Sequence, residues 1–424
     1  MKLYISAKNY ILRLNGNALV CIAFHPLWGV PYSLYFFYLS LYMKANGVTD
    51  AQLGILMLAG FAASIFFSII AAPLVDRMGR KRATFVFDLI SSAVPPLIYA
   101  ISGSFWFSLV AMVLTNANKV MSVAYYLIMV EDSDDDQRII AFNLFNIITV
   151  AAGILIPVAG FFVKLCGIIR AERFFLIFAC ISMTILIFIR NHFLKETTVG
   201  EKLLKNKSGR FSPGAAIRIY SDSYRFLAGH PAALLTVIAS IIFYVYYIIG
   251  TNNSLYFATY FIDALNLDEA SISILGSVYA VGMLIAMVII NPLVQRLNIF
   301  INLITGALLN TAGIVMLVII PSGSLPAAIV SIVVTSVGFG IFKSVLDAAL
   351  AITTEGKDRA GIYSIVNLLS SILGILTAGL CGILYPLNPK SVYFISIIIL
   401  FVSITCFTII LLKRGRYGQS KEAC

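Results

Sequence analysis

Charged residues are scarce in this sequence. Aspartate, glutamate, lysine and arginine make up 12% of the 424 residues, while 60% are hydrophobic. A soluble domain carries about twice that charged fraction. The composition therefore excludes an ordinary soluble globular protein and favours a chain that resides in a lipid bilayer.

Histidine, cysteine and nucleotide-binding motifs are also scarce or absent. The three histidines are His25, His192 and His230, and the six cysteines are scattered without a CxxC pair. A membrane-embedded enzyme needs a cluster of such residues, and an ATPase needs a phosphate-binding loop of the GxxxxGK[ST] type. We therefore expect no enzyme activity, no metal or other cofactor and no disulfide framework.

Long hydrophobic runs, by contrast, recur along the whole chain. Runs of roughly 18 to 25 residues are long enough to cross a bilayer as helices. Helices are favoured because lipid offers no water to unpaired backbone groups. The sequence predicts an all-α polytopic membrane protein with twelve transmembrane helices, at residues 18–42, 51–74, 84–102, 106–130, 140–163, 172–190, 233–260, 271–294, 299–320, 327–352, 361–384 and 391–412.

The net charge of +11 follows the predicted topology. With the N-terminus in the cytoplasm, 23 of the 30 basic residues lie on the cytoplasmic side, 5 outside and 2 within spans, when Arg173 and Arg190 at the ends of span 6 are counted with the sides they adjoin. This bias predicts that both termini are cytoplasmic, and it removes the reason to expect a nucleic-acid partner. The first span is too long for a cleaved signal peptide. We expect a multi-pass plasma-membrane protein, surrounded by lipid and monomeric.

A polar stretch from Arg190 to His230 separates six predicted spans from six. It holds eight basic residues together with glycine, serine and proline, which is typical of a cytoplasmic linker with a short surface helix, here near 218–227. The predicted domains are an N-terminal six-helix bundle at 1–190, a linker at 191–230 and a C-terminal six-helix bundle at 231–424.

Short motifs recur in the two halves in the same order, which indicates internal duplication and two pseudo-symmetric bundles. Transporters built in this way bind their substrate between the halves, near mid-membrane. The matching pairs are SLYF at 33–36 and 254–257, APLVDR at 72–77 and NPLVQR at 291–296, and Arg138, Asn146 and Gly153 with Arg359, Asn367 and Gly374, each 221 residues later.

The loop between spans 2 and 3 reads PLVDRMGRKR at residues 73–82. Topology explains its basic residues but not Asp76 or Gly79. The glycine permits a tight reversal, and the aspartate is placed to face the positive end of a neighbouring helix. This D-R-x-G-R-K run resembles the signature loop of the major facilitator superfamily, and the twelve spans and central linker extend the resemblance over the whole chain. Ala72 is a departure, because the family often has glycine there.

The resemblance implies alternating access by two rocking bundles and a cytoplasmic gate. It also implies that Asp76 latches onto the start of span 11, near Arg359–Gly361, when the cytoplasmic side is closed. Asp88 in span 3 is expected to belong to the gate, with a proton site as the alternative. The predicted gate residues are Asp76, Arg77, Gly79, Arg80, Lys81, Asp88, Arg138 and Arg359.

Polar residues interrupt span 4 at TNANKVMS, residues 115–122. A lysine at mid-depth costs about 2.5–3.5 kcal/mol on insertion scales, so Lys119 should face a water-filled cavity or a partner. We expect it to contact the substrate; a structural partner or a gating role is the alternative. On a helical wheel Thr115, Asn118, Lys119, Ser122 and Tyr126 share one arc with Asn116 at its edge, and Val113, Ala117, Val120, Ala124 and Ile128 form the opposite, lipid-facing side.

Span 10 offers a second lysine. Lys343 and Asp347 are four residues apart, close enough to pair on one helix face. Pairing is the leading interpretation for Lys343, and Asp347 is a candidate proton carrier whose protonation would free the lysine.

Further polar candidates lie in spans 1, 5, 7 and 11. His25 precedes Pro26 and is expected to be a satisfied buried histidine at a kink, with a functional role as the alternative. The duplicated asparagines suit helix–helix contacts and a cavity equally well, and two adjacent asparagines after Gly250 indicate a broken helix. The further candidates for the cavity are His25, Tyr32, Tyr35, Asn146, Asn252, Asn253 and Asn367.

These features favour a secondary active transporter that moves a small polar or anionic organic solute, driven by an ion or solute gradient, with a proton among the candidate coupling ions. The two intramembrane lysines favour an anionic group on the substrate. Proton-coupled efflux of lipophilic or drug-like compounds is the alternative, and a non-transporting receptor is a third.

Overall fold

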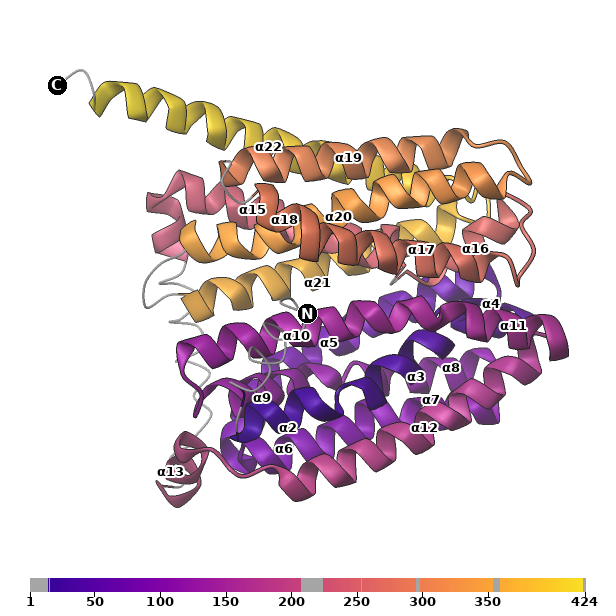
Figure 1. Ribbon diagram of the computed structural model, residues 1–424, viewed down its shortest axis with the longest axis horizontal. Helices are drawn as coiled ribbons and strands as arrows, with labels where there is room; N and C mark the ends of the chain where they lie inside the picture. Colours follow the sequence, from indigo (N-terminus) through magenta and orange to yellow (C-terminus); the bar gives the residue numbers. More distant parts are fainter. Residues whose placement is uncertain are drawn as a thin grey trace, which may run out of the picture. The chain divides into compact units, whose positions relative to one another are not determined.

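The computed structural model describes residue 14 and residues 16–206, 224–252, 254–294, 298–353 and 359–421, and every regular element in these ranges is a helix (Figure 1). Eleven described helices are long and apolar enough to cross a membrane, and the apolar stretch Leu368–Leu384 lies at the place predicted for span 11. The prediction of an all-α polytopic membrane protein is confirmed. The chain divides into two compact units, Met1–Phe211 and Ser212–Cys424.

The first unit contains the predicted spans 1 to 6. Several spans consist of more than one helical segment. Its elements are α2 (Gly16–Phe24), α3 (Pro26–Phe36), α4 (Leu39–Ala45), α5 (Asp50–Met78), α6 (Arg80–Asp88), the π-helical η1 (Leu89–Ala93), α7 (Val94–Ile101), α8 (Phe105–Thr115), α9 (Asn118–Val130), α10 (Asp135–Ala152), the short 3₁₀ helix η2 (Gly153–Leu155), α11 (Ile156–Cys166), α12 (Ile168–Phe193) and α13 (Thr198–Asn206).

The second unit contains spans 7 to 12. Residues 224–229 form a short helix at the end of the linker, overlapping the predicted surface helix. The remaining elements are α15 (Pro231–Gly250), α16 (Leu255–Asp263), α17 (Ile272–Ile285), the π-helical η3 (Ala286–Ile290), α18 (Asn291–Val294), α19 (Ile299–Ile319), α20 (Leu325–Thr353), α21 (Arg359–Leu384) and α22 (Ser391–Lys421).

Three spans are broken where the sequence places polar residues or proline. Span 1 breaks at His25, before Pro26, as the sequence predicts, because proline cannot donate a backbone hydrogen bond. Span 7 breaks between Gly250 and Leu255, next to the predicted asparagines, of which residue 253 lies outside the described ranges. Span 4 breaks between α8 and α9, within the TNANKVMS stretch.

Side chains at these breaks bond to backbone carbonyls of the preceding turn. The Thr251 hydroxyl donates to the carbonyl of Tyr247 at 2.5 Å. The Asn116 amide donates at 2.9 Å to the carbonyl of Met112, which also accepts the Asn116 backbone N–H at 3.3 Å. A broken helix in lipid needs such partners, so part of the polarity of span 4 serves its own backbone.

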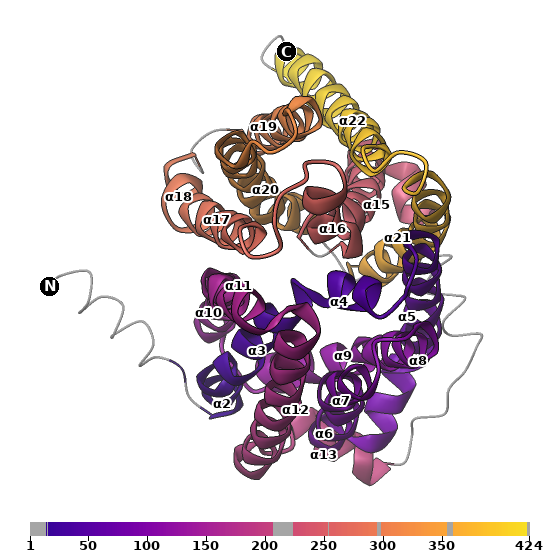
Figure 2. The ribbon, with the colours of Figure 1, turned by 90° about the vertical axis from the view of Figure 1, so that its right-hand side faces the viewer.

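Small residues bring α19 and α20 into close contact within the second unit, where the two helices run side by side (Figure 2). A Cβ atom on Gly306 would lie 2.9 Å from the backbone nitrogen of Phe342, and one on Gly338 would overlap the backbone nitrogen of Asn310. Without a hydrophobic effect between helices in lipid, close backbone packing of this kind provides much of the association energy.

We predict that Gly338→Ala lowers the stability of the protein by about 1–3 kcal/mol, because the added methyl group meets backbone atoms that cannot move aside. Thermal unfolding of the purified protein in detergent measures the effect. Gly229→Ala is the matched control, since a Cβ atom there meets nothing within 4 Å. Equal melting temperatures for the two variants would contradict the close packing.

Candidate functional site

A cavity of about 360 Å³ lies inside the first unit, among segments of spans 1, 3, 4, 5 and 6. This is within the size range of sites for small organic molecules. Most of the lining side chains are aromatic or methionine. The lining consists of His25, Trp28, Asp88, Asn118, Met121, Ser122, Tyr125, Tyr126, Met129, Phe142, Phe145, Asn146 and Arg190.

A buried ion pair forms part of the cavity wall. Asp88 of α6 and Arg190 of α12 are 1% and 5% exposed, and the Arg190 guanidinium donates to the Asp88 carboxylate. Ser92 donates to the second carboxylate oxygen at 2.6 Å, and the guanidinium carbon lies 5.0 Å from the centroid of the Tyr125 ring. A charge this deeply buried needs such a set of partners. The pair therefore joins spans 3 and 6 and contacts span 4.

Asp88 was predicted as a gate residue, with a proton site as the alternative. Its carboxylate lines the cavity and bonds to Arg190, and both roles stay predictions. The arginine escaped notice because, at the end of span 6, it reads as an ordinary basic residue of the positive-inside rule.

His25 is a satisfied buried histidine at a kink. It is 4% exposed, and its Nε2 lies 2.8 Å from the Thr149 hydroxyl oxygen. That hydroxyl donates to the carbonyl of Phe145, so the imidazole N–H is the donor in the histidine bond. The imidazole ring also stacks between Trp28 and Phe145, with centroid distances of 5.4 and 4.2 Å. Its position in the cavity wall adds a binding surface to this structural role.

The polar face of span 4 is divided between the cavity and its surroundings. Asn118 and Ser122 line the cavity, as does the neighbouring Tyr126. Asn116 does not, because its amide turns back to its own helix and packs on Gly60 of α5. Lys119 is half-buried outside the cavity lining, and within the described part of the chain its ammonium makes no hydrogen bond or ion pair.

The opposite face of span 4 does not meet lipid, so that expectation was wrong. Ala117, Val120 and Ala124 are fully buried, and Ile128 is 1% exposed. Val120 and Ala124 pack in one cluster with residues of α5 and α6, including Val75. A helical wheel shows which face of a helix is polar and which is apolar. It does not show whether the apolar face meets lipid or other helices of the protein.

The two tyrosines predicted for the cavity lie further along α3. Tyr32 stacks on Trp28, with a centroid distance of 4.7 Å, and meets Tyr35 edge-on at 5.6 Å. Tyr35 is 6% exposed. Neither lines the cavity, but Trp28 does, so the two rings extend an aromatic row away from it along one helix.

The structure describes only some of the candidate site residues in the second unit. Lys343 is half-buried on α20, with its Nζ 6.0 Å from the centroid of the Tyr244 ring, and Asn252 lies in the break of span 7. Asp347 and Asn367 belong to α20 and α21, but their side chains lie outside the description. The pairing and proton-carrier roles of span 10 therefore stay predictions.

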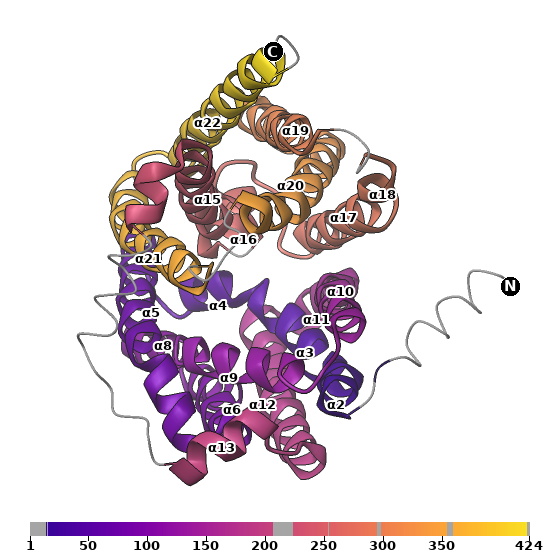
Figure 3. The same cartoon turned by 90° about the vertical axis from the view of Figure 1, so that its left-hand side faces the viewer.

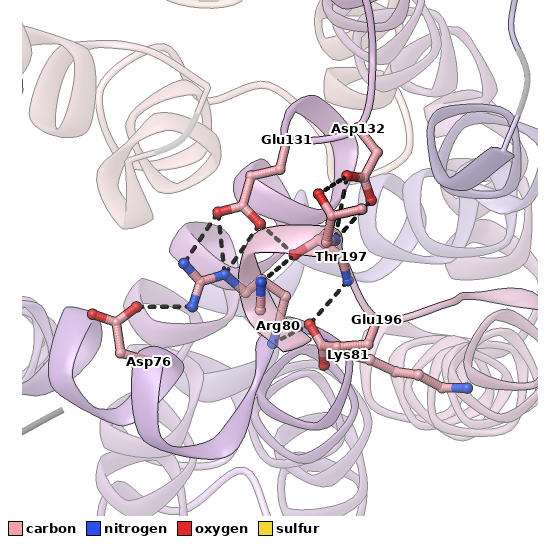
Figure 4. A network of polar contacts seen from close by, with 9 residues as sticks. Asp76, Arg80, Lys81, Glu131, Asp132, Glu196 and Thr197 are labelled. Atoms are coloured by element: carbon pink, nitrogen blue, oxygen red, sulfur yellow. Dashed lines mark hydrogen bonds and ion pairs between the residues drawn. The ribbon is translucent and has the colours of Figure 1, made fainter. Parts of the chain in front are cut away.

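The signature loop forms a second polar centre, which we call the loop network (Figure 4). Arg80 is its hub: the guanidinium donates to Asp76 at 2.8 Å and to Glu131 at 3.0 and 3.2 Å. Gly79 turns the chain into α6 with φ of 82°, a conformation that favours glycine. A side chain there would also meet the Glu196 carboxylate at 2.6 Å. Gly79 is thus required both for its backbone conformation and for the space beside Glu196.

The start of the linker closes the loop network. The Glu196 carboxylate accepts the backbone N–H groups of Arg80 and Lys81 at 2.9 and 3.0 Å, which caps the N-terminus of α6 (Figure 4). Thr197 donates to Glu131 through its hydroxyl. Helix α13 follows directly and lies beside the start of α6 (Figures 1 and 3).

The loop network therefore includes residues that sequence reasoning missed. Asp76, Gly79, Arg80 and Lys81 meet as a group, whereas Arg77 is exposed. The side chains of Arg138 and Arg359 lie outside the description, so the latch from Asp76 to span 11 stays a prediction. Glu131 and Asp132 belong to the stretch EDSDDDQR at 131–138, which resembles the family's acid-then-arginine loops, and the residues that were missed are Glu196, Thr197 and Thr198.

A polytopic all-α chain with a solute-sized cavity inside a helical bundle has the architecture of a membrane transporter. Among the residues that the structure describes, no group of three histidine, cysteine, aspartate or glutamate side chains could hold a metal ion. Residues 28–257 and 238–423 match the family model of the Major Facilitator Superfamily. The chain belongs to this superfamily of secondary transporters, which work by alternating access and are not enzymes.

Solved structures share the fold. A POT family transporter in complex with 5-aminolevulinic acid aligns with a TM-score of 0.69 at 14% identity, covering 93% of this chain and 95% of that one. The nucleoside transporter NupG aligns with a TM-score of 0.66 at 14% identity, covering 94% of this chain and 99% of that one. The xylose transporter XylE from E. coli gives 0.64 at 14% identity, with 94% and 97% covered. No match was found among curated proteins.

We predict that Asp88→Asn destabilises the protein by about 3–5 kcal/mol, because it leaves the buried Arg190 charge without a counter-charge. The double variant Asp88→Asn with Arg190→Gln should recover most of this loss. Thermal unfolding of the purified proteins provides the comparison. A single variant as stable as the wild type would show that the pair is not needed to hold spans 3 and 6 together.

The cap on α6 gives a further prediction. Glu196→Ala should remove about 1–2 kcal/mol of helix stabilisation, so backbone amides at Arg80 and Lys81 should exchange hydrogen roughly tenfold faster. Hydrogen–deuterium exchange with mass spectrometry of the full chain measures this. Glu201→Ala on α13 is the control, because Glu201 is exposed and its ion pair with Lys205 is long, at 4.0 Å. Unchanged protection in Glu196→Ala would show that Glu196 of the linker does not stabilise the N-terminus of α6.

Proposed function

We propose that this protein transports small organic solutes that combine a flat apolar body with an anionic or polar group, driven by an ion or solute gradient. Family membership supports the transport cycle. The substrate class rests on one observation, which is a solute-sized cavity with aromatic walls, near Lys119, a lysine without a partner among the described residues. We further propose that it acts as a monomer in the plasma membrane.

The cavity walls suit a flat apolar body. Trp28 and Phe145 both pack against His25 in the wall, and Tyr126 stacks on Phe142 with a centroid distance of 5.3 Å. Aromatic rings favour offset stacking with a bound ring. The methionines of the wall adapt to different shapes, because their unbranched side chains repack easily.

Lys119 suits an anionic group. It follows the cavity residue Asn118 directly and lies one turn before Ser122, whose hydroxyl donates to the Lys119 carbonyl at 3.1 Å. A half-buried ammonium without a partner is costly in an apolar region. An anion bound at the edge of the cavity would remove that cost. Arg190 is less available, because Asp88 already neutralises it.

The solved relatives fit this size and polarity class. Their names include 5-aminolevulinic acid, nucleosides and xylose, which are all small polar molecules. One observation favours the alternative, proton-coupled efflux of lipophilic or drug-like compounds: the wall is mainly aromatic, and the charges within it, Asp88 and Arg190, neutralise each other. The effect of removing Lys119 distinguishes the two functions, because binding of a lipophilic compound without an anionic group does not depend on the lysine charge.

We predict that Lys119→Ala weakens binding of benzenesulfonate about tenfold to a hundredfold, as expected for the loss of a hydrogen bond to a charged group. Binding of the uncharged analogue benzenesulfonamide should stay unchanged. Fluorescence of Trp28 in the cavity wall reports both titrations. The protein has two tryptophans, so a Trp106→Phe background leaves Trp28 alone, and Trp106 is 72% exposed.

Two comparisons complete this experiment. Lys164→Ala, at an exposed lysine of α11, is the matched control. Gradient-driven uptake of benzenesulfonate into proteoliposomes tests whether binding leads to transport. Near-normal affinity in Lys119→Ala would exclude the lysine from the site, and extrusion of ethidium without benzenesulfonate uptake would favour the efflux function.

A further inference from the structure

A carboxyl group without partners is buried at the start of α12. Glu172 is the fifth residue of this membrane-spanning helix, has no exposed surface, and neither of its side-chain oxygens has a hydrogen-bond partner. No ion pair within the described ranges includes it. The cavity arginine, Arg190, lies 18 residues further along the same helix, about 27 Å away at 1.5 Å per residue.

An ionised carboxylate cannot persist in this environment. Transfer of a bare charge into an apolar interior costs many kcal/mol, and such groups become neutral instead. The buried side chain of Glu172 is therefore the protonated acid in this state. Even the neutral acid leaves a polar O–H group unsatisfied, at a cost of about 1–3 kcal/mol. Leucine would fill this space at lower cost, so a buried acid here calls for a functional reason.

Cations are present nearby in sequence, but they do not neutralise the carboxyl. Arg170 and Arg173 of α12 and Lys164 of the adjacent α11 are all exposed. The Arg173 guanidinium reaches the Tyr42 hydroxyl at 3.5 Å instead. Among the described residues no cation is paired with Glu172, so protonation is the way in which its charge is removed.

Further titratable groups lie on the helices that pack against α12. Tyr35 of α3 is buried and lies close enough to Glu172 for an electrostatic interaction. On α4, Tyr42 donates its hydroxyl to the Tyr99 carbonyl of α7 at 2.8 Å, and the Lys44 ammonium pairs with Asp50 at 2.8 Å. Neither carboxyl oxygen of Glu172 has a hydrogen-bond partner among them.

One of these neighbours belongs to the aromatic row that begins in the cavity. Tyr35 meets Tyr32 edge-on, and Tyr32 stacks on the cavity residue Trp28. All three lie on α3, which packs along α12 and is tied to it by a hydrogen bond from the Ser182 hydroxyl to the Leu27 carbonyl at 2.8 Å. A ligand that shifts α3 would therefore also change the enclosure of Glu172.

We infer that Glu172 is the binding site of a proton that is exchanged with water during the transport cycle and couples transport to a proton gradient. When the start of α12 opens to water, a proton from water bonds to one carboxylate oxygen, and the neutral acid can then be enclosed. When the site opens again at lower proton concentration, that O–H bond breaks and the proton returns to water. The coupling rests on the proposed function, because it needs a transported solute.

Infrared difference spectroscopy of the full-length protein in lipid tests the proton site without any substrate. As the pH rises, the wild type should lose a carboxylic-acid carbonyl band and gain carboxylate bands. Glu172→Gln should lack this change, while Glu201→Gln, at an exposed glutamate of α13, should retain it. A pH-independent spectrum, or the same change in Glu172→Gln, would overturn the inference.

A flux experiment tests the coupling. One pH unit corresponds to a tenfold ratio of proton activity, so it can sustain about tenfold accumulation of benzenesulfonate per coupled proton. Glu172→Gln should lose this accumulation in proteoliposomes and keep exchange between equal concentrations. Retained proton-driven accumulation would overturn the coupling. If the wild type transports no benzenesulfonate at all, the proposed substrate class fails, and the infrared titration alone decides whether Glu172 exchanges a proton.

Discussion

Hydrocarbon cannot solvate a charge, so every ionisable side chain inside a membrane bundle needs a partner, a neutral form or a route to water. The first unit shows all three solutions. Asp88 and Arg190 neutralise each other and join spans 3 and 6. Lys119 is half-buried, has no partner in the described residues and follows the cavity residue Asn118, and Glu172 is fully buried. Paired charges stabilise the bundle, whereas we propose that the unpaired ones mark where a solute or a proton binds.

The backbone obeys the same constraint, and this explains why TNANKVMS is polar. Span 4 is broken between α8 and α9, and a break in lipid leaves backbone groups that need partners. The Asn116 side chain bonds to the Met112 carbonyl of the preceding turn, while Asn118 and Ser122, on the next turn, line the cavity. One short stretch thus supports the broken helix and shapes the cavity wall. Glycine at the break would do neither, because it has no side chain.

Sequence reasoning recovered what depends on local pattern and failed where distant segments meet. Hydropathy located the spans because bilayer thickness fixes their length, and the signature motif located Asp76 and Arg80. Arg190 and Glu196 were missed, since their partners Asp88 and Arg80 are 102 and 116 residues away. Glu172 was overlooked for a different reason. A glutamate at the first position of a predicted span looks like its polar boundary, and only the three-dimensional packing shows that it is enclosed.

Helix α12 connects these features physically. It is a single helix of 26 residues, with Glu172 near its start and Arg190 near its end, and the linker residue Glu196 follows within one turn's length of chain. A helix transmits displacement along its axis with little internal change. Gain or loss of a proton at Glu172 changes how α12 can pack at one end, and the other end carries the cavity ion pair and the cap on α6. Glu172 and Arg190 therefore share one helix, and Glu196 of the loop network follows its end, so a displacement of α12 would affect the packing at all three positions.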